Sequence, residues 1–448
     1  MIAAPGNGGG DRYPEGKNVD AIEAALCGDP VDLARETRPE LAALRGCPQT
    51  ERFHAEGDVA EHSRRVYDLA CEHADRLSDA LEPDETGPVI TPQQQALRLA
   101  GLLHDLGKPA TTKENGPGQW SAHGHDLEGA RLVSGLFATH PALLRLPLGL
   151  YASVHALVRA HMWTYAGERI SAGAALRLSH VSHPRLLTAL WDSDSRGRIC
   201  DDVAEVADRV AFAGLVLEEL DAARPDSHGL LDDVTARNSV SPRAWRETFR
   251  ALVEGGLRDV GAVGARLAAA ERHGTGGSIT YTIGLPGVGK STWAREVWAP
   301  ATGGTVLSGA GGRRRDRRAA AAAVLQQIPE QLAAGQDICV DATHLLRETR
   351  DVITTYAGRY GADLHAVYFH APLSLALKRQ TTRAGADAVP SATIQAMARK
   401  LRWPTPDEYQ TLSIVEPTGK AWAYTAESRW LSDPVALAAH PVRAAWSG

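Results

Sequence analysis

The sequence predicts two large domains of different class, an all-α domain followed by an α/β domain with a parallel sheet. Two patterns carry this prediction. From about residue 20 to residue 273, apolar residues recur three and four positions apart, which is the period of amphipathic helices. After the Gly-rich stretch HGTGGS at 273–278, strand-like and helix-like segments alternate, as they do in parallel sheets with crossover helices. The length of 448 residues suits two large domains.

Domain boundaries follow from the same patterns. Residues 1–19 are rich in Gly and Asn, and we expect them to form a flexible tail. We place the all-α domain at 20–224, a helical linker at 225–277 and the α/β domain at 278–448. No internal repeat is apparent, so each domain is expected to build its own core.

The composition excludes several classes of protein. Hydrophobic residues make up 44% and charged residues 23% of the chain, which is not the balance of a disordered protein. The sequence contains no run of about 18 apolar residues, so no membrane helix is predicted. The N-terminal MIAAPGNGGG has neither the basic nor the apolar region of a secretory signal. The five cysteines lie far apart with no CxxC, so we expect reduced thiols in a cytoplasmic protein.

Charge is divided unevenly along the chain. Of the 48 Lys and Arg and the 54 Asp and Glu residues, 19 and 14 lie in 278–448, which gives that part +5. The first 277 residues then hold 29 basic and 40 acidic residues, a charge of −11, with 13 of the 17 histidines. An acidic, His-rich part suits metal sites and a basic part suits phosphates or nucleic acid. Ordinary surface variation would also produce both values.

Segments of the all-α region carry metal-binding side chains on their apolar faces. The clearest helical segments are 59–69, 96–106, 154–161, 186–194 and 203–220. A polar group on an apolar face needs a partner. The inward or helix-end residues of this kind are His62, His104, Asp105, His125, His161 and Asp194. Any one of them could be a satisfied core residue or a helix cap, but so many in one helical domain indicate a bound metal.

The same stretches resemble the HD phosphohydrolase superfamily, and specifically the HD domain found beside bacterial tRNA nucleotidyltransferases. The resemblance rests on FHAEGDVAEHS, LLHDLGK, HGHDLEGA, VRAHM and DSDSRGR, which cover about 50–200 in the family's order. It implies a first divalent metal held by four residues, His62, His104, Asp105 and Asp194. It also implies a second metal position completed by His125 and His161, and a phosphate oriented by Lys108.

Two of these assignments keep alternatives at this point. Asp192 could replace Asp194 by a small shift of the alignment, and His123 could replace His125. Neutral histidines and carboxylates suit Mn, Fe, Co, Ni or Mg, and the sequence does not choose among them. A metal lowers the pKa of its bound water and so supplies hydroxide near neutral pH, which fits phosphate-ester hydrolysis.

The α/β region begins with a phosphate-binding loop. Residues 284–291 read GLPGVGKS, which satisfies G-x-x-x-x-G-K-[ST] between a strand at 278–283 and a helix at 291–298. Glycines permit the tight turn, backbone N–H groups hold phosphates, the lysine reaches the terminal phosphates and the serine reaches Mg²⁺. The predicted ATP-binding residues are Gly284, Gly287, Gly289, Lys290, Ser291 and Thr292.

Further strands are predicted at 305–308, 336–341 and 364–369. Asp341 closes the third strand of the region, where an acid suits Mg²⁺ or its waters, although it could also cap a helix. Arg379 and Arg383 are four residues apart, so they share one helix face and could close over a triphosphate.

These features resemble the 5′-end polynucleotide kinases of phage and bacterial nucleic-acid repair. The matching stretches are GLPGVGKSTWARE, VDATHL with Arg350, KRQTTR and AVPSATIQAM, over about 278–405. The resemblance implies that Arg379 and Arg383 grip the transferring phosphate. A chain that joins such a domain to an HD domain resembles the bacterial HD-Pnk end-healing proteins, which carry a 3′-side phosphohydrolase and a 5′-kinase.

The sequence departs from the kinase pattern at the position of the general base. The aligned stretch is TVLSGAGGRRR, so the base position falls on Ala310 and its neighbour on Gly311, and neither side chain accepts a proton. Asp316 could serve only after a local shift. The arginines at 313–318 could contact a phosphate or a strand, or could simply be a solvated helix start.

We therefore expect a nucleic-acid end-healing enzyme, with RNA favoured. The HD domain would remove 2′- or 3′-phosphates or open 2′,3′-cyclic phosphates. The P-loop domain would bind ATP·Mg and a 5′-OH end with impaired kinase activity. Two alternatives remain: an HD enzyme acting on free nucleotides, and a P-loop module that senses ATP or tethers RNA without transferring phosphate.

Overall fold

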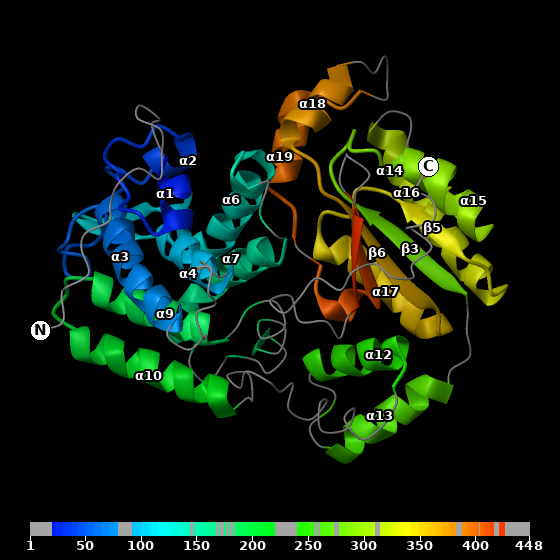
Figure 1. Ribbon diagram of the computed structural model, residues 1–448, viewed down its shortest axis with the longest axis horizontal. Coiled ribbons are helices and arrows are strands. Elements are labelled where there is room, and N and C mark those ends of the chain that lie inside the picture. Colours follow the sequence, from blue (N-terminus) through cyan, green and yellow to red (C-terminus); the bar gives the residue numbers. More distant parts are fainter. Residues whose placement is uncertain are drawn as a thin grey trace, which may run out of the picture.

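A computed structural model describes most of the chain. The described residues are 20–78, 92–143, 146, 148–166, 170, 174–175, 178, 182, 184–219, 240–254, 257, 260–272, 277–309, 314–381, 388–402, 404–415 and 421–425. A helical domain and a domain built around a six-stranded sheet lie side by side (Figure 1). The predicted tail, 1–19, and the predicted linker segment 225–239 lie outside the described residues.

The helical domain packs long helices around a Leu- and Ala-rich core. Its helices are α1 (Ala21–Cys27), α2 (Pro39–Ala42), α3 (Val59–Ser78), α4 (Pro92–Leu103), α5 (Lys108–Thr111), α6 (His125–Thr139), α7 (Leu148–Ala160), the 3₁₀ helix η2 (His161–Tyr165), α9 (Pro184–Gly197) and α10 (Val203–Glu219). Every predicted helical segment overlaps one of them. Helix α4 lies between α3, α7 and α9 and buries Leu99, Leu102 and Leu103 completely. Asp58 caps α3 by accepting from the backbone N of Glu61 (3.0 Å).

One element departs from the predicted run of helices. Strands β1 (Lys113–Gly116) and β2 (Gln119–Ser121) form an antiparallel hairpin directly after α5. The end of β1 and the turn read NGPG, which carries strong turn signals, and Gly118 has a φ of 69°, which favours glycine. The strand residues are polar and lack an apolar alternation, so no strand was predicted here.

The second domain contains the predicted parallel sheet. Its strands are β3 (Ser278–Ile283), β4 (Thr305–Ser308), β5 (Ile338–Asp341), β6 (Asp363–Phe369), β7 (Thr411–Val415) and β8 (Ala421–Thr425). Their order is β4-β5-β3-β6-β7-β8, and all neighbours are parallel except β8, which runs antiparallel to β7. Central strand β3 buries Ile279, Tyr281 and Ile283 on one face and Thr280 and Thr282 on the other, as expected of a strand covered on both faces.

Helices surround this sheet and connect its strands. They are α14 (Lys290–Trp293), the π-helical turn η4 (Ala294–Trp298), α15 (Ala299–Thr302), α16 (Arg314–Ala333), α17 (Arg347–Tyr360), α18 (Leu373–Thr381), α19 (Ser391–Ala398) and the 3₁₀ turn η6 (Pro406–Glu408). The predicted helix at 291–298 is thus formed by α14 and η4. No helix within the described residues is long and apolar enough to span a membrane.

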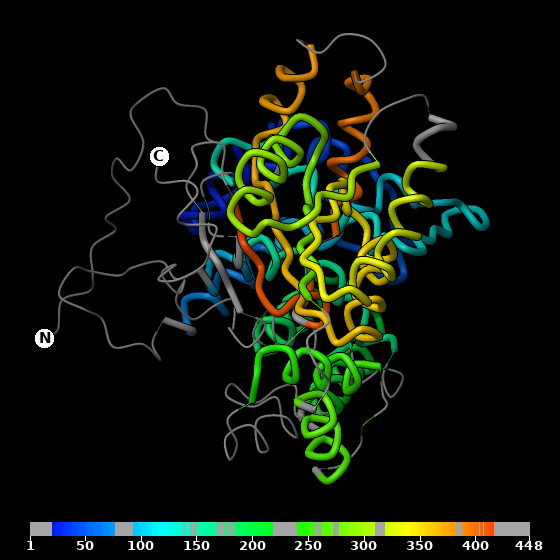
Figure 2. Tube along the Cα trace, turned by 90° about the vertical axis from the view of Figure 1, so that its right-hand side faces the viewer, coloured from blue at the N-terminus to red at the C-terminus, as the bar shows by residue number. Residues whose placement is uncertain are grey.

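Helices of the predicted linker pack against the second domain. Helices α12 (Pro242–Val253) and α13 (Val260–Arg272) contact each other and lie below the sheet in both views (Figures 1 and 2). Arg243 of α12 donates to the backbone oxygen of Gly361 (2.8 Å), and Arg250 lies 3.8 Å from the carboxylate of Asp351. At least α12 is therefore anchored to the sheet domain.

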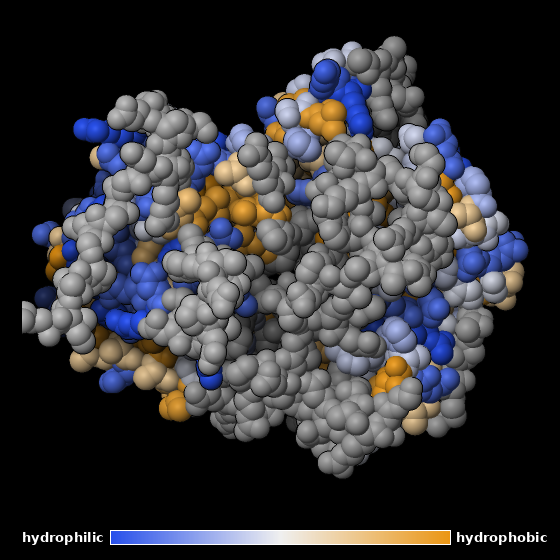
Figure 3. Space-filling view, viewed as in Figure 1, coloured by the Kyte–Doolittle hydropathy of each residue, from blue (hydrophilic) through white to orange (hydrophobic). Residues whose placement is uncertain are grey.

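The two domains also touch through α6. This helix contacts α18 and α19, and Ser134 on α6 donates to the backbone oxygen of Leu401 (3.0 Å). The hydroxyl of Tyr151 on α7 donates in turn to Ser134 (2.9 Å). Hydrophobic side chains gather over α6 and α7 on the side that faces the sheet domain (Figure 3). A buried polar relay thus joins the domains.

Candidate metal centre and phosphate-binding loop

The six metal-binding side chains expected from the sequence meet at one place in the helical domain. Nε2 of His62 lies 3.0 Å from Oδ1 of Asp194 and 3.4 Å from Nε2 of His104. Nε2 of His125 lies 2.9 Å from Nε2 of His161. Asp105 stands between the two groups. All six side chains are buried.

Asp105 turns one carboxylate oxygen to each group. Its Oδ2 lies 3.2 Å from Nε2 of His104, and its Oδ1 lies 3.3 Å from Nε2 of His125. The side chains therefore form two adjoining clusters, each able to hold a metal ion: His62, His104 and Asp194 in one, and Asp105, His125 and His161 in the other. A carboxylate placed in this way can bridge two ions.

Backbone carbonyls fix the orientation of three imidazoles. Nδ1 of His104 lies 2.9 Å from the oxygen of Gly101, Nδ1 of His125 lies 2.6 Å from that of Ala122, and Nδ1 of His161 lies 2.7 Å from that of Val158. A carbonyl can only accept, so each Nδ1 carries the hydrogen. Each Nε2 then points its lone pair into the centre when the ring is neutral, which is the usual arrangement of metal-binding histidines.

This geometry fits a bound cation. With both Nδ1 atoms protonated, neutral His125 and His161 face each other with two lone pairs 2.9 Å apart, which is unfavourable unless a positive charge lies between them. The donor set of imidazole nitrogens and carboxylate oxygens suits divalent transition metals.

Burial and charge set the pKa values in the cluster. Burial lowers the pKa of His161 to about 3, helped by the neighbouring His125. Burial alone would raise the pKa of Asp105, but His104 and Lys108 outweigh it and hold that pKa well below its usual range. The pKa of Asp194 is also held low, because Arg198, His62 and His104 together outweigh the effect of burial. Both carboxylates are thus ionised at neutral pH.

A carboxylate behind His62 was not expected from the sequence. Oε1 of Glu56 lies 2.9 Å from Nδ1 of His62 and 2.8 Å from Nδ1 of His54, while its Oε2 accepts from the backbone N of Ile199 (2.8 Å). Glu56 therefore sets a carboxylate beside Nδ1 of His62, where backbone carbonyls contact the other three histidines. Only its place in the stretch FHAEGD, six residues before His62, could have signalled this role.

A glycine lets the loop after α4 pack against the start of α6. A Cβ on Gly107 would collide with the backbone oxygen of His125 and the backbone nitrogen of Gly129. The tight contact between the HDLGK turn and α6 brings Asp105 and Lys108 beside His125. Glycine is needed here for a close approach of two backbones.

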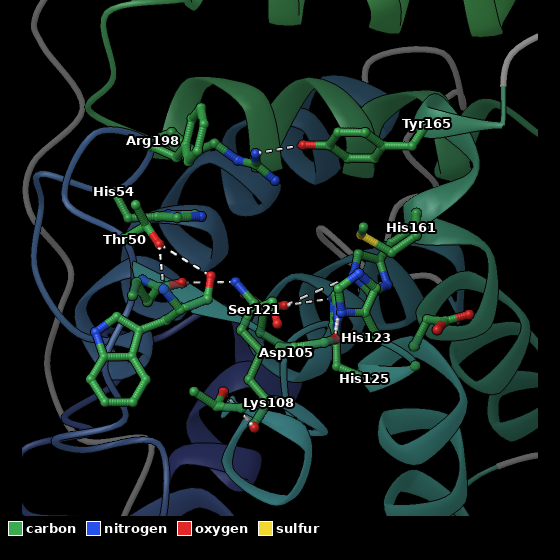
Figure 4. A pocket seen from close by; sticks show the side chains of 18 of the residues that line it. Thr50, His54, Asp105, Lys108, Ser121, His123, His125, His161, Tyr165 and Arg198 are labelled. Carbon is green, nitrogen blue, oxygen red and sulfur yellow. Dashed lines mark hydrogen bonds and ion pairs between the residues drawn. The ribbon is translucent and has the colours of Figure 1, made fainter. Parts of the chain in front are cut away.

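A cavity of about 590 Å³ opens over the cluster. Asp105, His125 and His161 form part of its lining, with Lys108 on one side and Arg198 and Tyr165 on the opposite side (Figure 4). Nζ of Lys108 lies 2.7 Å from Oδ2 of Asp105 and also donates to Gln49 (2.7 Å). Arg198, which the sequence analysis did not single out, pairs with Asp194 (3.1 Å) and donates to the hydroxyl of Tyr165 (2.9 Å).

The two alternatives left open by the sequence lie outside the cluster. Asp192 points elsewhere on α9, with Oδ2 2.7 Å from Nε2 of His73 and 3.2 Å from Arg196. His123 lines the cavity but is exposed and belongs to neither metal-binding group. The geometry therefore favours Asp194 and His125 over these two residues.

The predicted phosphate loop has the conformation that its glycines permit. Gly284, Gly287 and Gly289 all have positive φ, at 148°, 87° and 109°. These values disfavour other residues. The loop follows β3 and opens into α14, whose first residue is Lys290. Nζ of Lys290 donates to the backbone oxygen of Leu285 (2.7 Å), so the side chain curls back over the loop. Ser291 is half-buried and Thr292 is exposed on the same turn.

Asp341 ends β5, the neighbour of β3 in the sheet. Its Oδ2 accepts from the hydroxyl of Ser308 (3.0 Å), which ends β4. The carboxyl ends of three parallel strands thus bring Asp341, Ser308 and the phosphate loop to one edge of the sheet, where ligands bind in folds of this kind. Asp341 is buried, and it does not begin a helix, since α17 starts only at Arg347.

The predicted arginine pair is described only in part. Nη1 of Arg379 on α18 donates to the backbone oxygen of Gly287 at 3.4 Å, so this side chain already touches the phosphate loop. Arg383 lies outside the described residues, and so do Ala310 and Gly311 at the position of the general base.

A buried ionic network holds the segment that follows Asp341. Nε of Arg350 donates to Oε2 of Glu408 (2.7 Å), and Nη1 of Arg350 donates to the backbone oxygen of His344 (2.9 Å). His344 has a φ of 39°, unusual for a residue with a side chain, and its Nδ1 donates to the backbone oxygen of Thr282 (2.7 Å). Burial lowers the pKa of His344 to about 4. These contacts fix the turn between β5 and α17.

Comparisons with known proteins agree with the two regions. Residues 59–196 match the HD domain family, and residues 279–404 match a family of AAA domains. The first match contains all six residues of the metal cluster, and the second contains the whole phosphate loop. Glu56 and Arg198 lie just outside the limits of the first match.

Curated relatives match a smaller part of the chain. A multifunctional CCA protein of Teredinibacter turnerae is 40% identical over 98 residues, which cover 22% of this chain and 19% of the relative. That of Hahella chejuensis is 34% identical over 98 residues, 22% and 18% of the two chains. That of Legionella pneumophila strain Paris is 31% identical over 131 residues, 29% and 26% of the two. The match thus spans about a quarter of these relatives at most. The protein joins an HD domain to a P-loop kinase-like domain of the AAA type in one chain.

Proposed function

We propose that this protein heals nucleic-acid ends, with RNA as the favoured substrate. The HD domain removes 2′- or 3′-phosphates or opens 2′,3′-cyclic phosphates, and the P-loop domain binds ATP·Mg and a 5′-OH end. The observation that carries the proposal is the pair of adjoining clusters joined by Asp105, at the base of a cavity lined by Lys108 and Arg198.

The donor set would hold two divalent ions, from among Mn, Ni, Co, Fe and Mg. His62, His104, Asp105 and Asp194 would hold the first, and His125 and His161, with Asp105, the second. Ions held there supply a hydroxide near neutral pH and offset the charge of the phosphoryl group.

The chain's own cations would position the substrate. Lys108 and Arg198 approach the cluster from opposite sides, and each is only about a tenth exposed. Each now pairs with a carboxylate of the cluster. A phosphate between them would gain two charge-assisted contacts. We assign Lys108 and Arg198 to orienting the scissile phosphate.

In the P-loop domain, Lys290, Ser291 and Thr292 would hold ATP and its Mg²⁺ with the backbone of the glycine loop. Asp341 would bind Mg²⁺ or its waters, and Arg379 and Arg383 would grip the transferring phosphate. With alanine at position 310 the expected transfer to a 5′-OH is slow or absent.

One experiment separates the two domains. An RNA with 5′-OH and 2′,3′-cyclic phosphate ends is incubated with the protein and Mn²⁺ or Ni²⁺, with and without ATP, and both ends are mapped. His104→Ala should abolish phosphate release, whereas Lys290→Ala should abolish ATP binding and leave phosphate release intact. Metal-dependent release that persists in His104→Ala would refute the metal assignment.

The same assay decides between the kinase and a module without transfer. ATP-dependent phosphorylation of the 5′-OH in multiple turnovers would mean that another group, such as Asp316, serves as the base. ATP binding without transfer, together with an ATP effect on phosphate release or on RNA affinity, would support the sensing or tethering role. Release from free nucleotides but not from the RNA would replace the end-healing function by a nucleotide phosphohydrolase.

A further inference from the structure

Two exposed aromatic rings line the cavity above the metal cluster. Phe53 is 40% exposed and Tyr165 is 43% exposed, although large aromatic side chains are usually well covered. They come from different parts of the chain, Phe53 from the turn before α3 and Tyr165 from the end of η2.

Each ring carries a guanidinium over it. Arg52 lies 5.4 Å from the centroid of Phe53, and Arg209, on α10, lies 4.9 Å from the centroid of Tyr165. At exposed positions such pairs contribute only about 0.5–1 kcal/mol, which is little reason to hold two aromatic rings at the surface. We call Arg52, Phe53, Tyr165 and Arg209 the aromatic rim.

Phe53, Tyr165 and Arg209 line the same cavity as Lys108 and Arg198, and the two latter side chains lie deeper, each only about a tenth exposed. Tyr165 lies beside Arg198, on the side opposite Lys108 and Asp105 (Figure 4). Arg209 also donates to Glu205 (2.9 Å), and Asp126 in the lining is held by Arg159, so the acidic neighbours are partly neutralised. The cavity volume of about 590 Å³ is within the range that binds nucleotide-sized ligands.

A ring paired with a cation is suited to a base and its phosphodiester. Stacking of a base on an aromatic side chain tolerates any sequence, and the neighbouring guanidinium can contact the backbone phosphate. A free phosphate or a peptide would use the deeper cations but would gain little from two open rings. The combination therefore favours a strand end that enters the cavity with its terminal phosphate first.

We propose that the aromatic rim binds the last nucleotides of a single-stranded 3′ end, with Phe53 and Tyr165 stacking on bases and Arg52 and Arg209 contacting phosphodiesters. This inference rests on the proposed function and names the part of the substrate that the cavity recognises. It makes Phe53 and Tyr165 specificity-determining residues, which distinguish a polynucleotide end from a small phosphate ester.

The test compares two substrates across matched variants of the full-length protein. The substrates are a 3′-phosphorylated oligoribonucleotide and p-nitrophenyl phosphate, which has no nucleobase. Phe53→Leu and Tyr165→Leu should each raise KM for the oligonucleotide about ten- to hundredfold, because stacking is worth roughly 1–3 kcal/mol per base. In Phe53→Leu, turnover of p-nitrophenyl phosphate should stay within about twofold of wild type. Tyr165→Leu also removes the hydroxyl that accepts from Arg198, so its effects on the two substrates are compared with those of Tyr165→Phe.

Controls separate stacking from other roles. Tyr165→Phe keeps the ring and removes only the hydroxyl that accepts from Arg198, so it should retain most of the oligonucleotide affinity. Phe212→Leu changes a ring on α10 that is 44% exposed but lies outside the cavity lining, and it should leave both substrates unaffected. Fluorescence anisotropy of a labelled oligonucleotide, measured in EDTA, should give the same order of affinities without turnover.

Different results would overturn the stacking proposal and the proposed function on which it rests. Unchanged KM and unchanged anisotropy in both leucine variants, or equal losses for the two substrates, would overturn the stacking proposal alone. A wild-type protein that hydrolyses p-nitrophenyl phosphate but neither binds nor cleaves the oligonucleotide would overturn the proposed function as well. A deoxyribonucleotide version reports whether stacking suffices or a 2′-OH is also read.

Discussion

The metal cluster and the phosphate loop are built in opposite ways. The cluster collects six side chains from segments that span residues 62 to 194, and it exists only when several helices pack correctly. The phosphate loop lies within 284–291 and depends mainly on the conformation of three glycines in one turn. A distributed site should fail when any one distant member changes, whereas a compact loop should tolerate changes beyond its own turn.

The largest expected effect comes from exchanging the two acidic residues of α9. Asp194→Asn should reduce metal-dependent phosphate release about a thousandfold, because it removes a charged oxygen from one cluster and about 4 kcal/mol of transition-state stabilisation. Asp192→Asn, on the same helix but paired with His73, is the matched control and should stay within about twofold. Rates are measured on an RNA with a 3′-phosphate. Equal losses in the two variants would mean that the helix, not the ligand, is responsible.

A change in the second domain tests the buried ionic network that follows Asp341. Glu408→Gln leaves buried Arg350 without its partner carboxylate, which should lower the free energy of unfolding by about 3–5 kcal/mol. Denaturant titration measures this loss. Arg64→Ala, which removes an exposed pair with Glu61 on α3, should cost only about 0.2–1 kcal/mol. If Glu408→Gln unfolds no more easily than Arg64→Ala, the buried network does not support the domain.

A smaller effect is expected from changing Glu56, whose carboxylate lies behind His62. Glu56→Gln keeps the shape of the side chain but removes the charge beside Nδ1 of His62, and it should weaken metal binding about ten- to a hundredfold. Competition with a chromogenic chelator gives the affinity directly. Glu61→Gln, on the exposed side of the same region, should leave the affinity as in wild type. An unchanged affinity in Glu56→Gln would assign this carboxylate to packing alone.

The smallest effect concerns acid stability where the two domains meet. Burial lowers the pKa of His155 on α7 to about 3, with Arg402 and Arg159 adding to the shift, and its other near neighbour is the ring of Tyr151. His155 in the folded protein therefore binds a proton less readily than it does in the unfolded chain, where its pKa is 6.5. The contribution of His155 to the free energy of unfolding is fully present above pH 6.5. It decreases as the pH drops toward 3, by at most about 1.4 kcal/mol per pH unit.

His155→Phe should remove this part of the acid sensitivity. Urea titrations of wild type and variant at pH 7, 6, 5 and 4 measure the difference between their free energies of unfolding, which should change in favour of the variant as the pH falls. Parallel curves would show that His155 does not contribute. His123→Phe, at an exposed position, serves as the control.

Most of the architecture could be predicted from periodicity and local motifs. The helical segments, the first four strands of the sheet and the phosphate loop each leave a pattern within about twenty residues of sequence. The hairpin after α5 could not be predicted, because its polar residues do not alternate and its stability comes from partners elsewhere, such as the two hydrogen bonds between Thr50 and Trp120. Strands β7 and β8 lie at the edge of the sheet and also carried no assigned pattern.

The candidate site divides in the same way. The six candidate metal-binding residues stand out in the sequence because each interrupts an apolar stripe or belongs to a family motif. Glu56 and Arg198 were missed, since neither lies on an apolar face and their roles depend on contacts with His62 and Asp194. Such supporting residues become visible only when distant segments are brought together, which periodicity does not report.

The contact between α6 and the second domain limits how freely recombination can exchange either domain. The hydroxyl of Ser134 lies 3.0 Å from the backbone oxygen of Leu401, and a Cβ at Gly135 would come within 3.1 Å of the Arg399 side chain. Recombination that replaced either domain with a diverged relative would bring unmatched surfaces together at these points. We therefore expect the two domains to be inherited together, despite their different folds and separate sites.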